Sequence, residues 1–195
     1  MDLDDDILNE LFSALGAHLE RADAAVTVIV VGGAALAARG IVERTTKDVD
    51  VIARVEEVDR QRRIVRAEPF PPELTAAIER VARDFGLPPD WLNAVVGRQW
   101  ETGLPARFEE GMRWSVYGGL TVGLVGRGTL VALKLFAAVD QGPESVHWQD
   151  LLALGPTADE VDQAVAWVRS QDVGVEFERF VDEAHERLRE ELARG

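Results

Sequence analysis

Four residues within one short stretch have the types and the spacing that metal-bound phosphate chemistry needs. Gly32 and Gly33 follow an apolar run at residues 26–31, and Asp48 and Asp50 stand in the next apolar stretch. Strand side chains alternate with period two, so we expect both aspartates on one face, about 7 Å apart. Two carboxylates placed so repel each other unless they are solvated or a cation lies between them. Mg²⁺ prefers carboxylate oxygens, completed by water and substrate phosphates.

The two glycines supply the other half of such a site. A strand that ends in glycines and continues into a helix presents free backbone N–H groups at the helix N-terminus, where phosphates bind. Glycine also allows a ligand to approach the backbone closely. Together the glycine turn and the aspartates predict a site for a metal-bound polyphosphate. Taken separately, the glycines are explained by an ordinary turn and the aspartates by solvated positions.

The periodicity of the chain predicts the elements that must position these residues. Strands are predicted at residues 26–31 and 48–53, with a short helix of small residues between them that ends at Gly40. Two further short strands flank Gly118-Gly119. Longer helices are predicted at residues 4–22, 73–86, 129–140, 147–154, 158–170 and 176–193. Residues 54–70 are charged and then Pro-rich, which predicts a surface connection.

Two segments resemble a known superfamily. The stretch "GGAALAARGIVERTTKDVD" (residues 32–50) resembles the signature of the nucleotidyltransferase superfamily, DNA polymerase beta type, and is most similar to that of the AbiEii-like bacterial nucleotidyltransferases. The stretch "LVALKLFAAVDQGPESVHWQDLLAL" (residues 130–154) resembles that family's Lys-x-x-Ala helix, followed by a helix with an aspartate. The resemblance covers residues 28–53 and 129–154.

The resemblance implies an α/β fold, in which a small mixed β-sheet of nucleotidyltransferase type has flanking helices and a helical C-terminal segment. We expect a nucleotidyltransferase-like domain with an N-terminal helix at residues 1–154. We expect an acidic helical segment at residues 155–195, where two amphipathic helices follow Gly155-Pro156.

The resemblance also implies which side chains act in catalysis. Asp48 and Asp50 would hold Mg²⁺. Lys134 would neutralise the β- and γ-phosphates, and Asp150 would orient Lys134 or the nucleotide. Each of the last two has a plainer explanation: Lys134 could extend its ammonium into water from a half-buried helix, and Asp150 could be an acid of a helix's first turn.

A second set of residues would bind the substrate NTP. Gly32 and Gly33 would cradle the triphosphate, whereas Arg44 and Thr46 would contact the phosphate or fix the loop. The implied reaction is nucleotidyl transfer, in which an acceptor oxygen attacks the α-phosphorus and pyrophosphate leaves.

The chain departs from the superfamily pattern at two points. In the superfamily a third carboxylate usually lies on a neighbouring strand, but "WSVYGGLTVGLVG" (residues 114–126) has no acid. A related branch has "WLND" where this chain has Trp91-Leu92-Asn93-Ala94, so Ala94 stands in place of the acid. The serine after the turn glycine is replaced by Ala34. The enzyme would then work with two carboxylates, or use Asp90 or Glu101, or bind nucleotide without turnover.

Other chemically notable residues are expected to be structural. The basic cluster after the second strand stands beside three acids and predicts a solvated face, with a polynucleotide or triphosphate contact as the alternative; it consists of Arg60, Arg62, Arg63 and Arg66. The tryptophans of the middle region are expected to be core residues and not base-stacking residues, with the lining of a pocket as a further alternative; they are Trp91, Trp100 and Trp114.

Composition limits the class of protein. The 195 residues include no cysteine, which excludes disulfides and thiolate metal sites. The acidic start has no signal-peptide pattern, and no apolar run approaches the roughly 20 residues of a membrane span, so a cytoplasmic protein is expected. The net charge of −14 divides into −6 in residues 1–24, −6 in residues 155–195 and −2 between them. This distribution weakens the case for broad nucleic-acid binding and suits a cationic partner.

The favoured function is Mg²⁺-dependent transfer of a nucleoside monophosphate from an NTP to an unknown acceptor, which is RNA, protein or a small molecule such as an aminoglycoside. The AbiEii-like resemblance implies a toxin partnered by an antitoxin protein. The alternative is a catalytically degenerate module that binds nucleotide or protein. A third reading is a structural α/β domain whose acidic helices mediate assembly.

Overall fold

A computed structural model describes residues 2–172 and 174–194, including every side chain in these ranges except those of Arg98 and Gln99. The chain divides into two compact units. The first comprises Met1–Glu101 and Met112–Val125, and the second comprises Thr102–Gly111 and Gly126–Gly195. The predicted boundary after residue 154 lies inside the second unit, between two of its helices.

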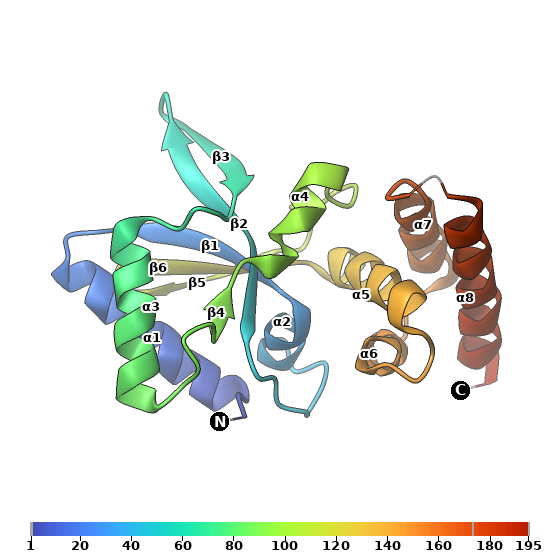
Figure 1. The fold of residues 1–195 in the computed structure, drawn as a ribbon, viewed down its shortest axis with the longest axis horizontal. Helices are drawn as coiled ribbons and strands as arrows, with labels where there is room; N and C mark the ends of the chain where they lie inside the picture. Colours follow the sequence, from blue (N-terminus) through green and yellow to red (C-terminus); the bar gives the residue numbers. More distant parts are fainter. Residues whose placement is uncertain (1, 173, 195) are drawn as a thin grey trace. The chain divides into compact units, whose positions relative to one another are not determined.

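A six-stranded mixed sheet forms the centre of the first unit (Figure 1). Its strand order is β3-β2-β1-β6-β5, and the short β4 pairs with β2 beside β3. The strands are β1 (Val26–Val31), β2 (Val49–Val58), β3 (Gln61–Arg66), β4 (Leu92–Asn93), β5 (Arg113–Tyr117) and β6 (Leu120–Leu124). β1 runs antiparallel to β2 and parallel to β6. The apolar run at residues 26–31, predicted as a strand, is therefore the central strand, because β1 stands in the middle of the strand order.

Helices pack against one face of this sheet. They are α1 (Asp5–Arg21), α2 (Gly32–Ala38) and α3 (Pro72–Phe85); η1 (Val95–Arg98) and α4 (Gln99–Thr102) follow β4. Leu8 and Phe12 of α1 line the same small cavity as Val122 and Leu124 of β6, which places α1 on the face that those two β6 residues share. The approach is close, because a Cβ on Gly16 of α1 would lie 1.5 Å from a β5 carbonyl oxygen.

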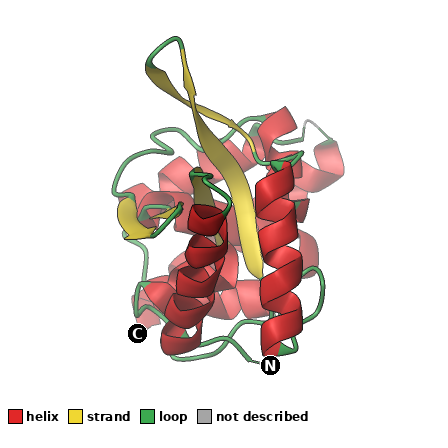
Figure 2. Cartoon of the chain, turned by 90° about the vertical axis from the view of Figure 1, so that its left-hand side faces the viewer, coloured by secondary structure: helices red, strands yellow, loops and turns green. Residues whose placement is uncertain are grey.

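The segment predicted as a surface connection is instead largely a β-hairpin. β2 continues to Val58 and pairs with β3 through a two-residue turn at Asp59 and Arg60. Both turn residues have positive φ, 54° and 62°, which is the conformation of a type I′ turn. The sequence does not reveal the hairpin because neither turn residue is glycine and no residue of β3 is buried. The hairpin projects beyond the helices of this unit (Figures 1 and 2).

The second unit is helical. It contains α5 (Arg127–Gln141), α6 (Val146–Leu154), α7 (Ala158–Arg169) and α8 (Val175–Arg194), each close to its predicted bounds. The α7 N-terminus has a capping box between Thr157 and Glu160. The apolar periodicity of residues 176–193 predicts that six side chains are buried: Phe177, Phe180, Val181, Ala184, Leu188 and Leu192. In the structure only Val181 and Leu188 of α8 are buried, and Phe180 is 40% exposed. α8 contacts α5 and α7 along a narrower stripe than the apolar pattern suggests.

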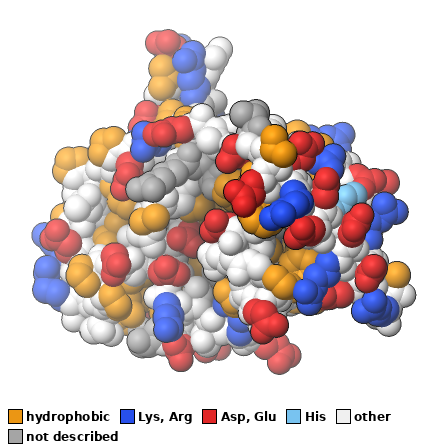
Figure 3. All heavy atoms as spheres, turned by 45° about the vertical axis from the view of Figure 1, so that its right-hand side comes forward, with side chains coloured by type: hydrophobic (Ala, Val, Ile, Leu, Met, Phe, Trp, Pro, Cys, Tyr) orange, Lys and Arg blue, Asp and Glu red, His pale blue; other side chains and the backbone are white. Residues whose placement is uncertain are grey.

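None of the helices in the described part of the chain combines the length and the apolar composition needed to span a bilayer. Acidic and basic side chains are interspersed on the face seen in Figure 3. The acidity of the chain is therefore not concentrated into one carboxylate patch on this face.

Candidate functional site

The glycine turn lies at the end of the central strand. β1 ends at Val31, and Gly32 begins α2 with a φ of +71°, a left-handed value that glycine adopts without strain. The N-cap residue of α2 is Val31, whose apolar side chain makes no capping hydrogen bond. Side chains from the following loop and strand press against the turn: a Cβ on Gly32 would lie 2.5 Å from Asp50 Oδ2, and one on Gly33 would lie 2.8 Å from Thr46 Oγ1.

The loop before β2 holds the next predicted residues against this turn. The backbone of Thr46 exchanges two hydrogen bonds with Leu3, of 2.8 and 2.9 Å, which tie the loop to the N-terminal segment. The buried Thr46 hydroxyl lies 3.2 Å from the carbonyl oxygen of Asp48 and 3.5 Å from its Oδ1. Arg44 Nη1 is 3.7 Å from the Cβ position of Gly33. Thr46 is thus the contact between the glycine turn and Asp48.

Asp50 is the second residue of β2 and lies between two strands. Its register partners are Val31, the last residue of β1, and Asn93 in β4. Asp48 directly precedes the strand, and both carboxylate side chains are half-buried. The structure therefore brings six predicted residues of the first unit into one cluster: Gly32, Gly33, Arg44, Thr46, Asp48 and Asp50.

The neighbouring strand presents an amide where the superfamily pattern calls for an acid. Asn93 lies in register with Asp50, and its Oδ1 accepts a hydrogen bond of 3.0 Å from Val95 N–H. Ala94 is buried. Sequence reasoning considered Ala94 but not Asn93, because the two-residue length of β4 leaves no periodic signal.

The two acids named as substitutes have other surroundings. Glu101 forms an ion pair of 3.1 Å with Arg66, and Asp90 is exposed in the turn before β4. Within residues 2–172 and 174–194, no three His, Asp or Glu side chains gather closely enough to bind a metal on their own.

Arg39 anchors the far end of α2. Its Nη2 donates a hydrogen bond of 3.3 Å to the Leu124 carbonyl oxygen in β6. Burial, and then the positive charge of Arg113, lower the pKa of Arg39 from its ordinary value. A cation next to the C-terminal end of a helix interacts favourably with the helix dipole, so Arg39 helps to fix α2 and the turn that begins it.

Lys134 and Asp150 form a buried ion pair in the second unit. Lys134 Nζ on α5 lies 2.8 Å from Asp150 Oδ2 on α6, and the side chains are 7% and 1% exposed. His147 Nδ1 is 3.4 Å from the same ammonium group. Lys134 therefore does not extend into water from a half-buried helix. His147, which no sequence motif singles out, joins the pair because it lies one turn before Asp150.

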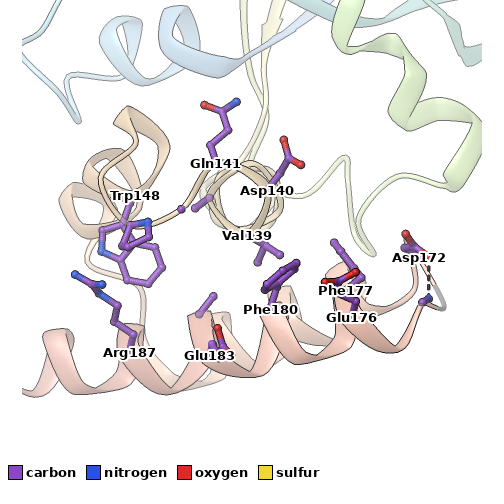
Figure 4. A pocket seen from close by; sticks show the side chains of 15 residues that line it. Val139, Asp140, Gln141, Trp148, Asp172, Glu176, Phe177, Phe180, Glu183 and Arg187 are labelled. Atoms are coloured by element: carbon purple, nitrogen blue, oxygen red, sulfur yellow. Dashed lines mark hydrogen bonds between the residues drawn. The ribbon is translucent and has the colours of Figure 1, made fainter.

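A hollow of about 700 Å³ lies elsewhere in the second unit (Figure 4). Phe180 of α8 points toward Val139 of α5, with Phe177 beside it, and Trp148 with Arg187 borders the other end. The Arg187 guanidinium lies 5.6 Å from the centre of the Trp148 ring. Neither member of the buried ion pair lines this hollow, so its aromatic lining belongs to helix packing and not to the phosphate chemistry considered above.

Comparison with known proteins agrees with the first unit's geometry. Residues 6–92 match a family described as nucleotidyltransferase of unknown function (DUF6036). The match spans less than half of the chain; it includes the six clustered residues of the first unit and excludes Lys134 and Asp150. No curated protein and no solved structure gives a significant match. The comparison supports the nucleotidyltransferase superfamily.

Proposed function

We propose that this chain is a Mg²⁺-dependent nucleotidyltransferase that moves a nucleoside monophosphate from an NTP to an acceptor. The observation that carries the proposal is the packing of Asp50 and Thr46 against the glycine turn, at 2.5 and 2.8 Å from the two Cβ positions. A phosphate that approaches the backbone at this turn meets Asp50 directly beside it. The family match over residues 6–92 supports the same activity.

The residues present fit a hard divalent cation. Asp48 and Asp50 offer carboxylate oxygens, and Mg²⁺ is usually held by one or two carboxylates together with waters and substrate phosphates. When bound, Mg²⁺ supplies Lewis-acid polarisation of the phosphoryl oxygens and neutralises the leaving pyrophosphate.

The chain's own residues bind and orient the substrate in this proposal. Backbone N–H groups of the glycine turn and the Arg44 guanidinium bind the triphosphate, since both are donors suited to phosphate oxygens. Thr46 fixes the loop that carries Asp48. The acceptor oxygen forms a bond to the α-phosphorus as the bond to pyrophosphate breaks. Lys134, oriented by Asp150, is proposed to neutralise the β- and γ-phosphates, as the resemblance implies.

A specific observation favours a second candidate, a degenerate module that binds nucleotide without transferring it. Asn93 stands in register with Asp50 on the neighbouring strand and is neutral. An amide there neither binds a metal as strongly as a carboxylate nor accepts a proton. The two candidates differ in a single result: both bind Mg²⁺ and NTP, but only the enzyme releases pyrophosphate.

Within the superfamily we propose an AbiEii-like enzyme, on the similarity of residues 32–50. Its acceptor is RNA, protein or a small molecule, and its partner is an antitoxin protein. Growth arrest upon expression of the wild type, absent for Asp48→Asn at equal protein level, is the expected result. Arrest by both proteins would contradict a toxin that works through this site.

Thermal unfolding with each of the four NTPs, with and without Mg²⁺, tests the site itself. A ligand at 100 times its dissociation constant adds about 2.7 kcal/mol, which raises the midpoint of a domain this size by roughly 5–10 °C. We expect a Mg²⁺-dependent shift in the wild type that is lost in Asp48→Asn and in Asp50→Asn. Asp6→Asn, an exposed acid of α1, is the matched control and should keep the shift. Radiolabel transfer from α-³²P-labelled NTP then separates enzyme from binding module.

A further inference from the structure

Trp114 does not lie in the core, where the sequence predicted it. It stands on the edge strand β5 with 43% of its surface exposed, whereas Trp91 is 1% exposed. Its ring lies across the backbone of Gly123 in β6: a Cβ on Gly123 would meet ring atoms of Trp114 at 2.6 to 2.9 Å. The absence of a side chain at Gly123 thus allows an exposed aromatic ring to lie flat on the sheet.

This ring lies on the sheet face that carries Asp50. Residues in register across a sheet share a face, and so do residues two apart along a strand. Trp114, Gly123 and Ile29 are in register across β5, β6 and β1. Val31 is two residues beyond Ile29 and is in register with Asp50. α1 packs against the opposite face, on Val122 and Leu124.

The distance between the Trp114 ring and Asp50 is short enough for one NTP molecule to reach both. Ile29, which is in register with Gly123, and Val31, which is in register with Asp50, are two residues apart along β1, which corresponds to roughly 7 Å. Gly123 in β6 and Asp50 in β2 are two strands apart, which corresponds to roughly 10 Å. Together these two offsets separate the Trp114 ring over Gly123 from Asp50 by roughly 12 Å. An extended nucleoside triphosphate is long enough to place its base at one of these positions and its polyphosphate at the other. A base on Trp114 is therefore compatible with a triphosphate at the glycine turn.

A cation stands beside the ring. Arg62 reaches from β3, the opposite edge strand, and its guanidinium lies 5.5 Å from the centre of the Trp114 ring. Arg62 is exposed and forms no ion pair among the described residues, although Glu57 is its partner in register. Nucleobases stack on aromatic rings and on guanidinium planes. An exposed arginine can change rotamer to admit a base between its guanidinium and the ring.

We propose that Trp114 is the stacking platform for the nucleobase of the NTP, with Arg62 covering the other side of the base. This inference deepens the proposed function and rests on it. Stacking is tolerant of base identity because every base has a π-face, so the platform contributes affinity to all four NTPs.

The test compares NTP with inorganic tripolyphosphate, which has no base. Both are titrated with Mg²⁺ into the wild type, Trp114→Ala, Trp114→Phe and Arg62→Ala, and binding is measured by calorimetry. Trp114→Ala should weaken NTP binding by about 5- to 100-fold and leave tripolyphosphate binding unchanged. Trp114→Phe should retain part of the NTP affinity. Val116→Ala removes another exposed apolar side chain, 72% exposed, from the same face of β5 and is the matched control that should change neither.

Three results would overturn the inference in distinguishable ways. Unchanged NTP affinity in Trp114→Ala removes the platform and leaves the proposed function intact. Equal weakening of NTP and tripolyphosphate assigns Trp114 a structural role only. If neither ligand binds the wild type, the proposed function itself fails. A short single-stranded oligonucleotide, titrated in parallel, identifies one further contradiction: if only its binding depends on Trp114, the ring serves a polymer and not the NTP.

Discussion

The carboxylate of Asp50 occupies the space that a side chain on Gly32 would need. The Cβ position of Gly32 lies 2.5 Å from Asp50 Oδ2, closer than real Cβ contacts come. Two separate features therefore require a glycine at position 32: its positive φ, and the Asp50 carboxylate that occupies the place of a side chain. These two requirements can be separated experimentally.

Gly32→Ala should impair nucleotide binding more than its backbone strain explains. Gly40 is the matched control, since its φ of +66° resembles the +71° of Gly32 but its Cβ position is open. Both substitutions should cost about 1–2 kcal/mol of unfolding free energy through the left-handed backbone. Only Gly32→Ala should also displace Asp50 and abolish the Mg²⁺-dependent thermal shift with NTP. Equal NTP shifts in the two variants would contradict a role for the Gly32–Asp50 contact.

Thr46→Val should separate the hydroxyl of Thr46 from its shape. The hydroxyl lies between the Gly33 Cβ position and Asp48 Oδ1, and its loss should cost about 0.5–1.5 kcal/mol of stability. Because Asp48 is then held less firmly, NTP affinity measured by calorimetry with Mg²⁺ should fall, whereas Thr46→Ser should keep it. Wild-type affinity in Thr46→Val would show that the hydroxyl does not position Asp48.

The buried pair of Lys134 and Asp150 should be costly to break and cheaper to replace. Asp150→Asn leaves a buried ammonium uncompensated, which typically costs about 3–5 kcal/mol. The double variant Lys134→Met/Asp150→Leu buries no charge and should be more stable than either single variant in urea unfolding. If the proposed role of Lys134 holds, this stable double variant still loses nucleotidyl transfer. Full transfer activity in it would leave the pair a purely structural one.

Glu160 should make folding stability depend on pH. Burial raises its pKa, but hydrogen bonds from the Thr157 backbone and from Arg127 outweigh this, so the net pKa lies below the ordinary value of 4.5. A lowered folded-state pKa contributes stability that is complete above the unfolded value and is lost as pH falls through the folded value. Unfolding free energy measured from about pH 6 to pH 3 should therefore fall less steeply in Glu160→Gln. Glu79→Gln, an exposed acid of α3, should keep the wild-type slope.

Much of the fold was open to prediction because its signals are local. The continuous apolar run of residues 26–31, the alternation of residues 48–53 and the helical stripes of α1, α3 and α5 each indicate how their element is buried. The hairpin at residues 49–66 was not predicted, because no residue of β3 is buried and the Asp59-Arg60 turn has no glycine. Where neither burial nor turn chemistry leaves a pattern, a strand cannot be recognised from its own residues.

The candidate site divides in the same way. Sequence alone determined that a glycine turn, two aspartates, Arg44 and Thr46 belong to one stretch of strand, turn, helix, loop and strand, because their spacing along the chain is itself the signal. Only the tertiary structure decided that Asn93 stands beside Asp50, that Lys134 is paired with Asp150, and that Trp114 lies exposed on the face of Asp50. These relationships depend on register between strands and on packing between helices. Residues far apart in the chain acquire them only when burial of the shared core brings their elements together.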